Sequence, residues 1–367
     1  MKNNSLDEII KCNVDISSPA SNDATFDTIL LVVPKPEAVG EKELSGVVAI
    51  SKADELLDYG FTTEDAVYTA STVAFSQSPA PSELLVCVRA TEGDGEEAEY
   101  EDITKTLARA NTEAQFYGVH LTVFKDSIDL TAAISWVEAN EKLLAFEYDS
   151  YENCPVSNFS YFRSFGFYSG NAEGFKADDQ PEVNQYAALA WMAKCFGYTP
   201  GTETWNLKEL TTIVPSALST EQKKNLEEKH INTFRRYAGC NCTIGGYTLG
   251  GEWIDVIRFR DWLKAEMQNR VFNALKVNKK VPFTDNGISL IEGAMESTLK
   301  EGQNIGGIAQ TEYDADNNAI PGYKVTVPKA SDLTEAERKS RKLGGCHYTA
   351  RLAGAIHMVE IEGFLTF

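Results

Sequence analysis

The sequence predicts an α/β fold with more than one domain. Two observations support this expectation. Short runs of branched apolar residues, each about the length of a strand, alternate with helical patterns through the first half of the chain. Two successive helix–strand units there imply parallel strands joined by right-handed crossovers. A chain of 367 residues is also long enough for two or three domains with cores of their own.

The first half predicts strands rich in branched residues at 28–33, 47–50, 83–89, 119–124 and 143–148. Helical patterns separate them at 62–76, 100–116 and 130–140, and an Ala-rich helix follows at 181–196. Nucleotide-binding proteins share this layout. However, no GxGxxG or GxxxxGK[ST] motif lies at any strand-to-helix junction. The sequence therefore does not indicate a cofactor-binding domain.

The second half starts with a polar helix at 219–229, where Ser219 and Gln222 have the spacing of a capping box. Strands are expected at 231–237 and 240–249, and then the longest helical pattern of the chain. That pattern has an apolar stripe and a charged rim. The stripe comprises Ile254, Ile257, Leu263, Met267, Val271 and Leu275, and the rim comprises Arg258, Lys264, Glu266, Arg270 and Lys276.

The last third predicts a second helix at 288–300, a short strand at 323–327 and a helix over 331–342. This last helix has acids first and bases last, as the helix dipole favours. Residues 347–367 then form an extended segment. Its final ten residues alternate apolar and polar side chains, and residues 12–17 do the same at the other end. Such ends either fray or add as strands to another sheet.

The residues that could carry chemistry do not form a recognisable site. Seven cysteines are scattered, and the close pair Cys240 and Cys242 fits strand alternation better than half of a metal site. No G-x-S-x-G motif occurs. Asp255 and Asp261 point to different helix faces, so we expect them to bind backbone groups or a neighbouring arginine. We predict no catalytic residue, no cofactor and no metal.

Charge and hydropathy narrow the range of partners. The net charge is −20, and residues 1–249 carry 19 Lys and Arg against 38 Asp and Glu, whereas residues 250–367 carry 15 against 16. An acidic first part repels nucleic acid and membrane surfaces, so neither is an expected partner. The apolar runs fall short of the roughly 20 residues that span a bilayer. The N-terminus has no apolar signal core, which predicts a protein that is made in the cytoplasm.

Three separated motifs resemble contractile-tail sheath proteins of myophages and R-type bacteriocins. They are GGEWIDVIRFRDWLKAEMQNRVFNAL at 250–275, KVPFTDNGISLIEGAM at 280–295 and ARLAGAIHMVEIEGFLTF at 350–367. The resemblance extends upstream through TPGTETWNLKEL at 199–210 and weakens before about residue 178. It covers roughly the last half of the chain by motif, and the rest by the order of its elements.

The resemblance implies a multi-domain α/β sheath subunit with extended terminal arms. We expect an N-terminal arm at 1–27, an outer α/β domain at 28–200, an inner mixed α/β domain next to the tube at 201–346 and a C-terminal arm strand at 347–367. Such a subunit polymerises helically around an inner tube and contracts by rigid-body rearrangement, driving the tube through a target cell envelope. An α/β enzyme with an unrecognised site is the alternative.

The resemblance also implies partners and a location. The partners are further copies of the chain in stacked, six-fold rings, the inner tail tube protein, and baseplate and tail-terminator proteins. Direct insertion into a membrane is not expected. The location is a virion or phage-tail-like particle that is assembled in the cytoplasm of a bacterial host.

Two sets of residues are the candidate sites. The terminal strands would be lent to the sheets of neighbouring subunits, through Val14, Ile16, Val359, Ile361, Phe364 and Leu365. A basic cluster would face the tube, because contacts that must break on contraction are better made of screened charges than of buried apolar surface. Its first members are Arg338, Lys339, Arg341 and Lys342, and its second are Lys264, Arg270 and Lys276. A merely solvated basic helix end is the alternative.

Overall fold

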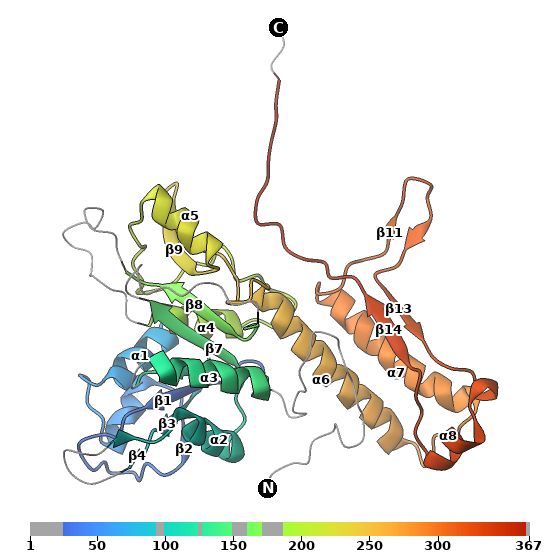
Figure 1. The fold of residues 1–367 in the computed structure, drawn as a ribbon, viewed down its shortest axis with the longest axis horizontal. Coiled ribbons are helices and arrows are strands. Elements are labelled where there is room, and N and C mark those ends of the chain that lie inside the picture. Colours follow the sequence, from blue (N-terminus) through green and yellow to red (C-terminus); the bar gives the residue numbers. More distant parts are fainter. Residues whose placement is uncertain (1–24, 93–98, 124–126, 149–159, 171–185, 365–367) are drawn as a thin grey trace. The chain divides into compact units, whose positions relative to one another are not determined.

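The computed structural model describes residues 25–92, 99–123, 127–148, 160–170 and 186–364 of the chain (Figure 1). The chain divides into two compact units, Met1–Asn269 and Arg270–Phe367, called here the N-terminal unit and the C-terminal unit. Within the described residues, no helix is long and apolar enough to cross a bilayer. The mixed α/β class predicted from the sequence is confirmed.

An eight-stranded sheet forms the centre of the N-terminal unit, in the order β10-β9-β8-β7-β6-β1-β3-β2. The strands β3, β1, β6, β7, β8 and β9 run parallel, and the two edge strands pair antiparallel. Every side chain of β1 is buried, as a continuous apolar run covered on both faces requires. The strands are β1 (Ile29–Val33), β2 (Val47–Ile50), β3 (Leu84–Val88), β6 (Gly118–Leu121), β7 (Leu143–Tyr148), β8 (Ser164–Tyr168), β9 (Asn232–Tyr237) and β10 (Cys240–Ile244).

Helices cover both faces of this sheet (Figure 1). One face packs against α1 and α4, and the other packs against α2 and α3. The short strands β4 (Thr91–Glu92) and β5 (Glu99–Tyr100) form a separate pair. The predicted capping box of α5 is present, with Ser219 accepting from the Gln222 N–H. The helices are η2 (Ala53–Tyr59), α1 (Ala66–Phe75), α2 (Ile103–Glu113), α3 (Ser127–Asn140), α4 (Ala187–Phe196) and α5 (Thr220–Glu228).

The N-terminal unit does not divide near residue 200, where the sequence placed a domain boundary. The strands β9 and β10, from beyond that point, continue the same sheet. Trp205, Phe234 and Ile257 belong to the hydrophobic cluster that also contains Ile29 of β1. The ranges 28–200 and 201–346 are therefore not separate cores. The first compact unit extends to Asn269 because sheet pairing joins segments that charge and local pattern treat separately.

In the described residues, the C-terminal unit contains the end of α6, the long helix α7, two short helices and two antiparallel strand pairs. Helix α6 (Ile254–Val277) starts in the N-terminal unit and ends in this one. Thr284 caps α7 by accepting from the Gly287 N–H, and the buried face of α7 packs against β13. The remaining elements are α7 (Asp285–Asn304), β11 (Glu312–Tyr313), β12 (Ala319–Ile320), β13 (Tyr323–Thr326), η4 (Ala330–Asp332), α8 (Glu335–Ser340) and β14 (His347–Ala350).

The first two thirds of α6 are buried on nearly every side, which corrects the predicted charged rim. Arg258 and Lys264 are buried rather than exposed. A charge removed from water is tolerated only when it is paired and hydrogen-bonded. Arg258 accordingly forms an ion pair with Glu203 and donates to the carbonyl oxygens of Cys195 and Phe26 at 3.1 and 2.8 Å.

Asp261 is the centre of a second buried network. Its carboxylate accepts from Arg163 Nη1 and Nη2 at 2.8 and 3.0 Å and from the Tyr117 hydroxyl at 2.7 Å. Arg260 Nη2 donates to the same group at 2.9 Å. Burial alone would raise the pKa of Asp261, but the guanidinium of Arg163 holds it below the ordinary value. The expectation that Asp261 binds a neighbouring arginine is confirmed.

We predict that Asp261→Asn destabilises the N-terminal unit by about 3–5 kcal/mol, because it leaves the buried Arg163 without its counter-charge. Urea unfolding followed by tryptophan fluorescence measures this loss, since Trp191 and Trp205 are both buried in this unit. The matched control is Glu228→Gln in the exposed Lys224–Glu228 pair at 3.7 Å. The control should cost less than about 1 kcal/mol. Equal losses in the two variants would contradict the assignment.

Asp255, in the first turn of α6, should make the free energy of unfolding depend on pH. Burial, with the nearby charge of Glu203, raises its pKa from 3.8 to about 6. Because the folded-state pKa lies above the unfolded one, Asp255 costs no stability below pH 4 or so, and its cost grows as the pH rises through about 6. Asp255→Asn should therefore stabilise the protein by about 1–3 kcal/mol at pH 7 and not at pH 4. Urea midpoints at both pH values measure this, and a variant that is no more stable at pH 7 would reject it.

Candidate functional site

The edge of the sheet where α/β proteins bind ligands is closed by ion pairs within this chain. Ligands of open α/β sheets lie outside the carboxyl ends of the strands, where the strand order reverses. Here that position is the end of β1, between β3 and β6. The charged groups near it are Arg89, which follows β3, and Glu101 and Arg109 from the start and middle of the α2 region.

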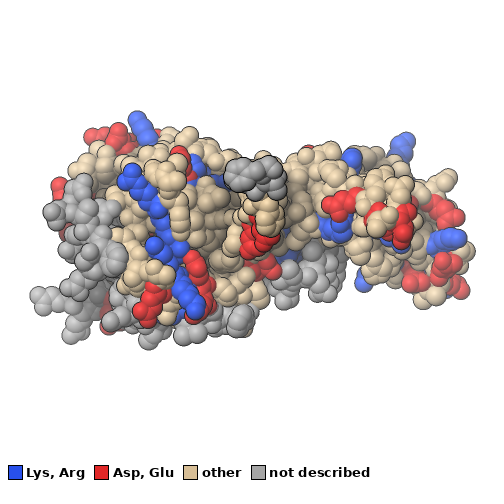
Figure 2. All heavy atoms as spheres, turned by 90° about the horizontal axis from the view of Figure 1, so that it is seen from above, with Lys and Arg blue, Asp and Glu red and all other residues tan. Residues whose placement is uncertain are grey.

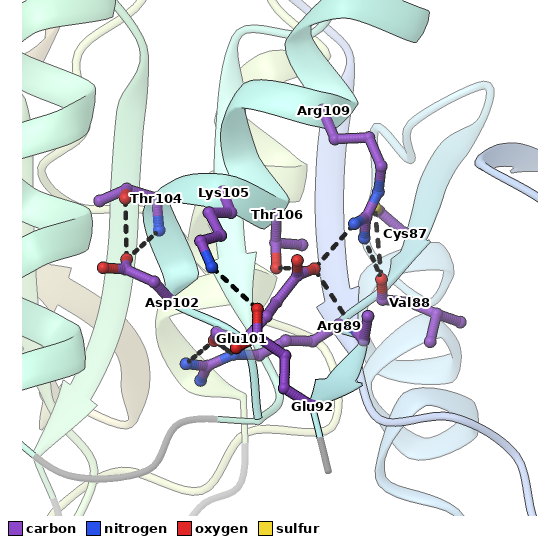
Figure 3. Close-up of polar contacts among 11 residues, drawn as sticks. Cys87, Val88, Arg89, Glu92, Glu101, Asp102, Thr104, Lys105, Thr106 and Arg109 are labelled. Atoms are coloured by element: carbon purple, nitrogen blue, oxygen red, sulfur yellow. Dashed lines mark hydrogen bonds and ion pairs between the residues drawn. The ribbon is translucent and has the colours of Figure 1, made fainter. Parts of the chain in front are cut away.

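Each of these charges already has partners in the chain. Arg89 forms a two-point ion pair with Asp129 at 2.6 and 2.9 Å and donates to the Glu101 carbonyl oxygen. Arg109 donates to Glu101 Oε1 and to the Val88 carbonyl oxygen, both at 2.8 Å (Figure 3). The side-chain carboxylate of Glu101 also accepts from Thr106 at 2.8 Å. The arrangement ties the end of β3 to α2 and α3 and leaves its arginines engaged by protein groups.

Other reactive side chains in this part of the fold are also in structural positions. Burial raises the pKa of the Cys87 thiol, which disfavours the nucleophilic thiolate. His120 Nδ1 lies 3.0 Å from the Ala145 carbonyl oxygen inside the sheet. Glu147 accepts from the Ala188 N–H at 2.9 Å, at the start of α4. Among the described residues, no three His, Cys, Asp or Glu side chains are grouped to hold a metal ion.

Exposed large apolar side chains gather in the C-terminal tail, at Leu352, Ile356, Met358, Val359, Ile361 and Phe364. After β14, residues 351–364 make one isolated bridge, Leu352 with Ile308, and no strand. Of the predicted strand-addition residues, Val359, Ile361 and Phe364 are 69, 88 and 91% exposed. Large exposed apolar patches on proteins are typical of interaction sites. Leu365, Val14 and Ile16 lie outside the described residues.

Among the described residues, the sheet beside this tail has only two strands. It consists of β13 and β14, with four residues in each strand and one face directed at α7. A two-stranded sheet is marginally stable in water, and three or more strands are usually needed for independent stability. Unpaired edge groups also favour the addition of a further strand. The unit thus combines an exposed apolar segment with a short two-stranded sheet.

Of the basic residues predicted to face a tube, some are exposed, some are bound to other parts of the chain, and one is buried. The side chains of Lys339, Arg341 and Lys342 are exposed around the end of α8, and Lys339 pairs with Glu335 at 2.7 Å. Arg338 instead holds α8 in place, because it donates to the carbonyl oxygen of Phe283 at 2.9 Å and to that of Ala330.

The three second-choice residues differ more from expectation. Lys276 is exposed, and Arg270 is half-buried with Nη1 donating to Ser297 Oγ at 2.8 Å. Lys264 is buried with its Nζ 3.6 Å from Glu141, so it is not available as a surface charge. Periodicity placed Lys264 on a rim that is in fact covered by the end of α3.

Surface charges of both signs occur on the face of the molecule seen in Figure 2. On the N-terminal unit a row of Lys and Arg side chains lies among acidic ones. The acidic excess of residues 1–249 is therefore not a uniform negative surface. The exclusion of nucleic acid stays a prediction from net charge.

Comparison with known proteins agrees with the sheath resemblance. Residues 254–364 match the family model described as E217 tail sheath protein gp31-like, C-terminal domain. No curated protein sequence matches the chain. The family match covers the end of the N-terminal unit and nearly all of the C-terminal unit, including the tail.

Solved sheath structures share the fold over almost the whole chain. The contracted helical sheath of the anti-feeding prophage aligns with a TM-score of 0.65 and 13% identity over 97% of both chains. The contracted PVC sheath complex of an extracellular contractile injection system gives 0.64 and 10% over 97% of this chain and 96% of that one. A sheath tail protein from Desulfitobacterium hafniense gives 0.53 and 11% over 86 and 93%. The predicted resemblance to contractile-tail sheath proteins is confirmed.

Proposed function

We propose that this chain is the structural subunit of a contractile tail sheath, which polymerises helically around an inner tube and drives it through a cell envelope on contraction. The observation that carries the proposal is the shared fold over 97% of the chain with two contracted sheaths. The family match of the C-terminal part supports it independently. The closed sheet edge around Arg89 gives the enzyme alternative no site among the described residues.

In this proposal, subunits are linked by lending terminal strands to each other's β13–β14 sheet. The exposed side chains of Val359, Ile361 and Phe364 supply the apolar contacts, and strand addition supplies main-chain hydrogen bonds. Leu365 continues this segment, and Val14 and Ile16 would serve the same role from the other end of the chain. Gly344 and Gly345 precede β14 and are both exposed, with Gly345 at φ 75°, so they fit a hinge. Contraction would then be a rigid-body rearrangement without nucleotide hydrolysis.

The proposal includes a tube-proximal side and a set of partners. We assign the tube-facing surface to the C-terminal unit, where Lys339, Arg341 and Lys342 are exposed. Stacked six-fold rings, an inner tube protein, and baseplate and tail-terminator proteins are the proposed partners. The particle would be a phage tail or phage-tail-like particle assembled in the cytoplasm of its bacterial host.

The purified full chain is expected to form sleeves or filaments that are visible by negative-stain electron microscopy. Deleting residues 359–367 should leave a folded chain that stays monomeric, because the lent strand is missing. Gel filtration and microscopy measure assembly, and circular dichroism checks the fold. As the control, Glu360→Gln with Glu362→Gln retains every apolar side chain of the segment and should still assemble. Sleeves formed by the truncated chain would overturn the strand-lending mechanism.

Reversing exposed charges at the end of α8 tests the tube contact. Lys339→Glu with Lys342→Glu should abolish sheathed tubes in particles while sleeves of the subunit alone still form. We retain Arg338, since it anchors α8 through the Phe283 carbonyl oxygen. The lost Lys339–Glu335 pair is exposed and should cost less than about 1 kcal/mol. Sheathed particles at the normal yield from this variant would exclude the assignment.

A further inference from the structure

The C-terminal unit carries opposite charges at the two ends of α7. The twenty residues of this helix span about 30 Å at 1.5 Å per residue. The segment before its first turn, residues 276–284, contains three lysines and no acid. The segment after its last turn, residues 310–321, contains three acids and no base. The segment that leads into α7 is therefore basic, and the segment that follows it is acidic.

The basic end, called here the lysine corner, consists of Leu275, Lys276, Val277, Lys279 and Lys280. All three lysines are exposed, and within the described residues none of them forms an ion pair. The two apolar residues are also exposed, Val277 by 77% and Leu275 by 39%. Exposed apolar side chains beside exposed charges can supply both the apolar and the electrostatic part of a contact.

The acidic end is the β11–β12 hairpin, which projects from the unit (Figure 1). Its turn is held rigidly by Asp314, whose carboxylate accepts from the Asp316 and Asn318 N–H groups at 2.9 and 2.8 Å. Its base is held by Arg351, which pairs with Glu312 at 2.8 Å. Within the described residues, Glu312 is thus the acid of the hairpin with an ion pair, whereas Asp314 and Asp316 have none, and Tyr313 is 66% exposed.

Two features indicate that the hairpin is built to bind. A hairpin with a fixed turn and a fixed base loses little conformational freedom when it is bound, so less of the interaction energy is spent on ordering it. A large aromatic side chain beside a charge is also the composition of an interface anchor. Neither feature would be needed in a loop that only connects α7 to β13.

We propose that the hairpin of one subunit docks on the lysine corner of the next. The two surfaces differ, so a contact in which each subunit uses its hairpin on one neighbour and its corner on another is heterologous, joining different surfaces of identical chains. Such a contact repeats from subunit to subunit, as the helical assembly proposed above requires, and the inference rests on that assembly. Tyr313 and Ile320 would meet Leu275 and Val277, while Asp316 and the lysines fix the register.

This contact is separate from strand lending. It uses side chains at the ends of α7, whereas strand lending uses main-chain edges of β13 and β14. It also predicts a salt dependence that main-chain pairing lacks, because exposed charges are screened over about 8–10 Å at physiological ionic strength.

A charge swap in the full-length chain tests the contact. Lys279→Glu with Lys280→Glu should raise the critical concentration for sleeve assembly at least tenfold, and so should Ala315→Lys with Asp316→Lys. Combining the two pairs should restore assembly to within about threefold of the unmodified chain. The matched control, Lys35→Glu with Lys52→Glu, makes the same change in net charge at exposed positions of the N-terminal unit and should have no effect. Circular dichroism confirms that each variant is folded.

Cross-linking gives a second readout. In sleeves mixed from isotopically light and heavy chains, carbodiimide should join Lys279 or Lys280 of one chain to Asp316 of another. Assembly that is unchanged in both single swaps, or a combined variant that is not rescued, would overturn the inference while leaving the sheath role intact. Lost assembly in the lysine variant alone would mean that the corner binds something other than the hairpin, which also overturns it. If the unmodified chain forms no sleeve, the proposed function fails first.

Discussion

The N-terminal unit depends on one electrostatic constraint: the charges that Arg258 and Asp261 of α6 bring into its interior must be paired. Asp261 accepts from Arg163 at the start of β8 and from Tyr117 before β6, so one carboxylate ties the helix to two strands of the sheet. Arg258 does the same for the loop after α4 through Glu203. Removing one partner leaves the other as an uncompensated buried charge, so the loss of either pair is costly. The first half of the long helix is in effect part of the sheet domain.

The C-terminal unit differs from the N-terminal unit because few of its side chains are buried. Its buried apolar side chains are mainly Ile288, Ile291, Met295 and Leu299 of α7, with Ile308 and Leu333 beside them. Neither large hydrophobic cluster contains a residue beyond Ile257. Its main sheet has two strands of four residues, which is too little for independent stability. Exposed large apolar side chains gather in this unit rather than in the N-terminal unit.

Structural features that depend on a few adjacent residues could be predicted from the sequence. The uninterrupted apolar run of β1 and the Ser219–Gln222 spacing each report on a few adjacent residues, and both are confirmed. The prediction was wrong where the partner is distant: Arg258 was placed on an exposed rim because its partner Glu203 is 55 residues away. The boundary near residue 200 was wrong for the same reason, since β9 pairs with β8 across it. In the candidate site, the alternation of apolar and polar residues indicated an extended C-terminal tail. The β11–β12 hairpin is too short and too polar to show such a period.

The two kinds of contact proposed for the C-terminal unit suit a contracting assembly in different ways. Strand addition forms a row of directional main-chain hydrogen bonds, so it persists as long as the strand stays in its sheet, and a flexible linker can absorb rotation. Contacts between exposed charges are weak individually and can be exchanged at low cost when subunits slide. A sheath built only from charges would fall apart on contraction, and one built only from buried apolar surface would not move. A unit with a short two-stranded sheet, an exposed apolar tail and opposite charges at the two ends of α7 provides for both requirements in fewer than a hundred residues.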